Sequence, residues 1–140
     1  MMIPMRKRAA QMGFAWRILA ATSLFAIGTM LHPESMSPVV MGDLAFRIEL
    51  EAWIAGFIGG ALLVLYGITI NGKMRWSPVL RIVGYGFLAF MLTVLFWSAW
   101  TAPSGVALWS WGVPFIWCRC AYFMAINVSD AALRWRNAGH

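Results

Sequence analysis

Four long apolar stretches, separated by shorter polar segments, dominate the pattern of this chain. A helix rises 1.5 Å per residue, so about 20 residues cross a hydrocarbon core of about 30 Å. The pattern therefore predicts four membrane-spanning helices, over roughly residues 14–31, 52–70, 82–102 and 106–128. The longer connecting segments contain Gly, Pro, Ser and Asn, which are typical of turns. We predict an all-α polytopic membrane protein, a four-transmembrane-helix bundle in one membrane domain over residues 1–140.

The composition agrees with that class. Of the 140 residues 61% are apolar and 11% are charged, against about 25% charged in a typical soluble protein. The net charge of +6 would suit a nucleic-acid ligand, but the basic residues form short clusters between apolar runs. The expected partners are therefore the lipid bilayer and its anionic headgroups, and no nucleic acid.

The basic residues also predict an orientation. With four spans and the N-terminus inside, ten of the 11 Lys and Arg residues lie on the cytoplasmic side and only Arg47 lies outside. Without the first span the division is five against six, which is no bias. We therefore predict that both termini lie in the cytoplasm, with residues 32–51 as the outer loop and 71–81 as the inner loop. A multi-pass protein of the bacterial inner membrane is expected.

The first apolar stretch has a second interpretation. Arg17 leaves only Ile18 to Leu31 free of charge, and Ala26 to Gly28 fits the small-x-small pattern of a signal-peptide cleavage site. The apolar run continues through Leu31, beyond that cut, which favours a retained span. Cleavage near Gly28 stays open as the alternative.

Residues that could carry chemistry are few. Cys118 and Cys120 are two positions apart, so on a helix they face nearly opposite sides and cannot hold one metal ion together. The only histidines are His32 and His140, outside the predicted spans. We find no nucleophile constellation or phosphate loop, and no Asp, Glu or His in the centre of a span. The sequence predicts no catalytic residues, no cofactor and no metal, and disfavours a pump.

Arg119 is the one ionisable residue deep in a predicted span. Its side chain could extend toward the inner-leaflet phosphates, or it could line a neck or form an ion pair with a partner subunit, and both interpretations remain open. Arg17, Lys73 and Arg75 are further candidates for lipid-headgroup or partner contact. The cost of inserting Arg119 nearly cancels the apolar gain of its span, and Pro114 is expected to bend it. Packing against neighbouring helices should therefore hold this span in place.

The inner tail carries one possible ion pair. Asp130 and Arg134 are four residues apart, and a solvated pair is the simplest interpretation.

Small residues predict a helix-packing face. Ala52, Gly56 and Gly60 recur every four residues, and Gly84 could face them from the third span. Small side chains let membrane helices approach closely. The face could serve contacts within the monomer or the seam of a homo-oligomer.

The segments "MSPVVMGDLAFRIELEAWIAGFIGG" and "YGITINGK" carry a family resemblance, over roughly residues 36–73. They combine an S-P-x-x-x-G turn, an acid shortly before a tryptophan-led span, and an I-N-G turn at its exit. In these features the chain resembles small, uncharacterised membrane proteins of tailed bacteriophages. The resemblance implies a phage or bacterial origin, with insertion in the host membrane, and implies no catalytic role.

Three functions fit the pattern. The favoured one is a non-enzymatic membrane protein that acts through helix packing with a membrane partner or in assembly. The alternatives are a holin-like protein that forms membrane lesions and a channel or transporter subunit for small neutral solutes, for which the spans offer only scattered polar residues.

Overall fold

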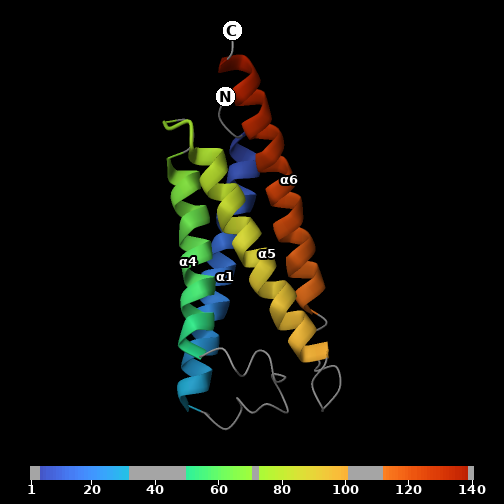
Figure 1. Ribbon diagram of the computed structural model, residues 1–140. Helices are drawn as coiled ribbons and strands as arrows, with labels where there is room; N and C mark the ends of the chain where they lie inside the picture. Colours follow the sequence, from blue (N-terminus) through green and yellow to red (C-terminus); the bar gives the residue numbers. More distant parts are fainter. Residues whose placement is uncertain (1–3, 32–49, 71–72, 101–111, 139–140) are drawn as a thin grey trace.

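The computed structural model describes residues 4–31, 50–70, 73–100 and 112–138, and every element within these ranges is a helix (Figure 1). This confirms the all-α prediction. The helices are α1 (Met5–Leu31), α4 (Leu50–Thr69), α5 (Ser77–Trp100) and α6 (Val113–Ala138).

Successive helices run in opposite directions (Figure 1). The start of α1, the turn between α4 and α5, and the end of α6 therefore lie together, at what we call the termini end of the bundle. The opposite end holds the end of α1 and the starts of α4 and α6. The main contacts join α1 to α4, α4 to α5 and α5 to α6.

Among the described residues, three helical segments are long and apolar enough to cross a membrane: Met5–Leu31, Glu51–Thr69 and Ser77–Ser98. Their length and composition support a membrane protein. Helix α6 is not among them, and it carries four charged residues, Arg119, Asp130, Arg134 and Arg136.

The helix bounds refine the predicted spans. Helix α1 begins at Met5, well before residue 14, and α5 begins at Ser77, so residues 77–81 are helical and not part of a loop. Helix α6 begins at Val113 and continues beyond residue 128 to Ala138, whereas residues 106–111 lie outside the described ranges.

Pro114 lies in the first turn of α6, where its missing N–H removes no helical hydrogen bond. The physical reason for the predicted bend at Pro114 is therefore absent.

The centre of the bundle holds an aromatic layer. Phe14 of α1, Tyr85 of α5 and Phe123 of α6 approach each other pairwise, with ring centroids 5.4 to 6.2 Å apart. Large apolar side chains also cover the outside: Leu24 is 70% exposed and Phe90 is 63% exposed. An apolar exterior is what a lipid-facing bundle requires.

Candidate functional site: a buried polar network

Arg81 lies inside the bundle near the termini end, with none of its surface exposed. Its Nη2 donates to Asp130 Oδ2 of α6 at 3.3 Å, and Arg134 Nη2 approaches the same oxygen at 3.4 Å. One carboxylate is thus shared by two guanidinium groups, and the trio keeps one excess positive charge.

This geometry corrects the interpretation of Asp130 and Arg134 as a solvated pair. The two side chains do pair, but they are only 14% and 15% exposed, and Asp130 also binds Arg81. Arg81 was predicted to close the inner loop, yet it stands in the second turn of α5. The sequence contains a signal for this contact. Asp130 is the only acid after Glu51, so it is the only side-chain carboxylate in that part of the chain with which a buried cation could pair.

A second buried contact joins α1 to α6. Asn127 Nδ2 donates to Gln11 Oε1 at 3.3 Å and to the carbonyl oxygen of Phe123 at 2.7 Å. Gln11 and Asn127 are both fully buried. Amide pairs of this kind hold membrane helices together because the alternative is an unsatisfied polar group in hydrocarbon.

Arg81, Asp130, Arg134, Gln11 and Asn127 form what we call the polar network. Tyr85 lies one turn beyond Arg81 on α5, and its buried hydroxyl has no hydrogen-bond partner within the described residues. Two buried nitrogens of Arg81, Nε and Nη1, likewise find no acceptor there. These buried polar groups lie beside an apolar core, while large apolar side chains also cover the outside of the bundle.

The chemistry available to the polar network is limited. Its single carboxylate is neutralised by two arginines, and within the described ranges no group of three or more His, Cys, Asp or Glu residues could hold a metal ion. Buried polar pairs can select which helices meet and in which register, which is their best-attested use.

Of the four predicted packing residues, three lie in the contact between α4 and α5 and one is exposed. A Cβ on Gly56 would lie 2.6 Å from Met91 of α5, and one on Gly60 would lie 2.8 Å from Leu88. From the other side, a Cβ on Gly84 would meet Val64 at 2.6 Å. These three glycines therefore lie in the contact between α4 and α5, whereas Ala52 is exposed.

The predicted lipid-contacting residues are spread over the bundle. Arg17 is exposed on α1, and Lys73 and Arg75 are exposed in the turn between α4 and α5. Arg119 is exposed on α6, with its guanidinium carbon 5.7 Å from the ring centroid of Phe123. It lies six residues after the start of α6, or about 9 Å along the axis, so it is nearer to the end opposite the termini.

The cysteines lie as the helical spacing predicts, with Cys118 exposed, Cys120 buried and both free.

In comparisons with protein-family models, with curated proteins and with solved structures, nothing matches this chain.

Proposed function

We propose that this chain is a non-enzymatic, multi-pass protein of the bacterial inner membrane that acts by packing one of its helices against a partner helix in the bilayer. Four spans with both termini inside are favoured by the positive-inside bias, which is nine basic residues against two when Arg119, nearer to the opposite end of α6, is counted with Arg47. Three of the spans have the required length and composition. Helix α6 is the fourth span in this proposal. Its Asp130 pairs with Arg81 and Arg134 inside the bundle, and these pairs reduce the free-energy cost of burying the carboxylate.

The observation that carries the proposal is a second face of small residues on α4. Gly56 and Gly60 face α5, but Ala52, Ala55 and Gly59 are exposed. A Cβ on Gly59 would meet nothing within 4 Å. Ala55 and Gly59 repeat the small-xxx-small spacing that lets membrane helices approach closely, on a surface that the described residues leave uncovered.

The test uses a photo-crosslinking amino acid at Leu62, which is 52% exposed and one turn beyond Gly59. In living cells this probe should yield one discrete adduct. Gly59→Leu should abolish the adduct without unfolding the bundle, since its side chain would occupy open space. A band of twice the chain mass identifies the partner as a second copy.

Gly28→Leu is the matched control, because Gly28 of α1 is also in a helix with nothing within 4 Å of an added Cβ. It should leave the adduct intact. A probe at Phe90, 63% exposed on α5, should crosslink only to lipid. Adducts at Leu62 that survive Gly59→Leu would contradict the proposal.

The same strain separates the proposal from the lesion-forming alternative. Expression of the chain alone should leave the membrane potential intact. A collapse of the potential on induction would contradict the packing role and favour a holin-like protein.

A further inference from the structure

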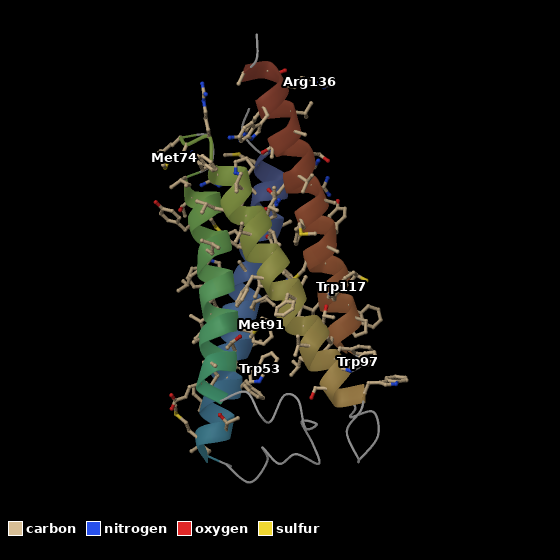
Figure 2. All side chains as sticks on the ribbon, viewed as in Figure 1. Trp53, Met74, Met91, Trp97, Trp117 and Arg136 are labelled. Atoms are coloured by element: carbon tan, nitrogen blue, oxygen red, sulfur yellow. The ribbon has the colours of Figure 1, made fainter. Side chains whose placement is uncertain are left out.

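A pocket of about 540 Å³ opens at the termini end of the bundle, between the α4–α5 turn and the last two turns of α6. Its walls include Lys73, Arg75, Trp76, Arg134, Trp135 and Asn137. Figure 2 shows this end of the molecule, where Met74, another wall residue, and Arg136 are labelled.

The pocket walls are cationic. Lys73, Arg75 and Arg134 line it, and among the residues that the structure describes no carboxylate does. Arg134 pairs with Asp130, whose carboxylate also binds Arg81, so the exposed Lys73 and Arg75 are the wall residues that offer charge to a further anion. The adjacent C-terminus of α6 carries a partial negative charge, so these side chains must supply the attraction.

The pocket also has aromatic walls. Trp76 and Trp135 meet edge to face, with centroids 6.5 Å apart, and they are 60% and 66% exposed. Tryptophan rings prefer the headgroup level of a bilayer, where one edge is apolar and the other is hydrated. A free inorganic ion would gain nothing from these rings, whereas the glycerol and upper acyl region of a lipid would pack on them.

We propose that this pocket binds the phosphate headgroup of an anionic phospholipid, with Lys73 and Arg75 contacting the phosphate and the two tryptophans contacting the glycerol region. This inference rests on the proposed function, because it requires the termini end to lie at the membrane surface. It adds a defined site to the diffuse attraction that any basic segment has for an anionic leaflet.

The experiment is native mass spectrometry of the purified full chain in a mild detergent, titrated with phosphatidylglycerol, phosphatidylcholine or inorganic phosphate. The chain should retain one phosphatidylglycerol molecule in preference to phosphatidylcholine. Lys73→Gln with Arg75→Gln should weaken that binding by about tenfold or more, because the variant loses two charge-assisted contacts to the phosphate.

Arg6→Gln with Lys7→Gln is the matched control. It also removes two adjacent exposed charges at the termini end, and neither residue lines the pocket. It should change the affinity less than twofold. Equal losses in both double variants would overturn the site in favour of diffuse attraction. Equal retention of the two lipids, or displacement of phosphatidylglycerol by an equal concentration of inorganic phosphate, would overturn the lipid assignment.

Trp135→Leu tests the aromatic wall. It should weaken phosphatidylglycerol binding severalfold while the charge is unchanged, and unchanged affinity would contradict the aromatic contact.

Fractionation of the same cells distinguishes failure of the lipid pocket from failure of the proposed membrane function. A chain that fractionates with membranes but shows no lipid preference overturns the pocket alone, whereas a chain absent from membranes overturns the proposed function.

Discussion

The contact between α4 and α5 and the attachment of α6 are held by different interactions. Helices α4 and α5 meet through glycines and aliphatic side chains, including Gly60, Gly84, Val64 and Leu88. Helix α6 meets its neighbours through the Arg81–Asp130 and Gln11–Asn127 pairs in addition to Phe123. The two apolar helices can rely on close approach, whereas α6, with four charged residues, needs partners for its polar groups.

The largest effect is expected at Asp130. Asp130→Leu leaves the buried Arg81 without its carboxylate, and should destabilise the bundle by about 3–5 kcal/mol. Reversible unfolding in mixed micelles measures the loss. Arg81→Met combined with Asp130→Leu should recover much of the stability, because the fully buried cation is then removed, whereas Arg134 lines the open pocket and can reach water.

Glu51→Leu, which removes an exposed acid at the other end of the bundle, is the control and should change stability by less than about 0.5 kcal/mol. If Asp130→Leu is no worse than Glu51→Leu, α6 is not held by the ion pair, and the contrast between the two contacts fails.

An intermediate effect is expected at Gly84. Gly84→Val places a Cβ 2.6 Å from Val64 Cγ2 and within 3.2 Å of backbone atoms of Gly60 and Val64, which cannot move aside cheaply. A loss of about 1–3 kcal/mol should follow. Gly86→Val, two residues further along, would meet only the Met124 sulfur at 3.6 Å and should be nearly neutral. Equal stability of the two variants would show that α4 and α5 are not in close contact.

The smallest effect is expected at the amide pair. Asn127→Leu and Gln11→Leu should each cost about 1 kcal/mol, and a double-mutant cycle should give a coupling of about 0.6 kcal/mol between them. Ser129→Ala is the control, since Ser129 bonds only to the Ala125 carbonyl oxygen of its own helix. Zero coupling would mean that α1 and α6 associate through their apolar contacts alone.

Much of the helical pattern could be predicted from the sequence. Apolar length set the helical class, and the predicted span 52–70 agrees with α4 (Leu50–Thr69) to within two residues. Four-residue spacing also picked out Gly56 and Gly60, which meet α5. Ala52 does not follow them, because each four-residue step turns the helix about 40° past a full rotation, and two steps carry Ala52 away from the contact.

The polar network could not be predicted in the same way. A charged residue beside a turn is normally solvated, so Arg81 was read as a loop residue. Its burial depends on Asp130, 49 residues later, and on the start of α5 at Ser77. That start is fixed by a tertiary contact, in which the buried Ser77 hydroxyl donates to the Gly67 carbonyl oxygen at 2.7 Å. Local patterns of hydrophobicity reveal neither the contact between Arg81 and Asp130 nor the contact between Ser77 and Gly67.

The distance along the chain between Arg81 and Asp130 has a consequence for biogenesis. Arg81 leaves the ribosome 49 residues before Asp130, so α4 and α5 are available for insertion while the guanidinium still lacks its carboxylate. The Ser77–Gly67 bond already closes these two helices into a hairpin at their shared turn. If the helices insert in chain order, we expect the hairpin to enter first, with Arg81 held at the water boundary until α6 supplies Asp130.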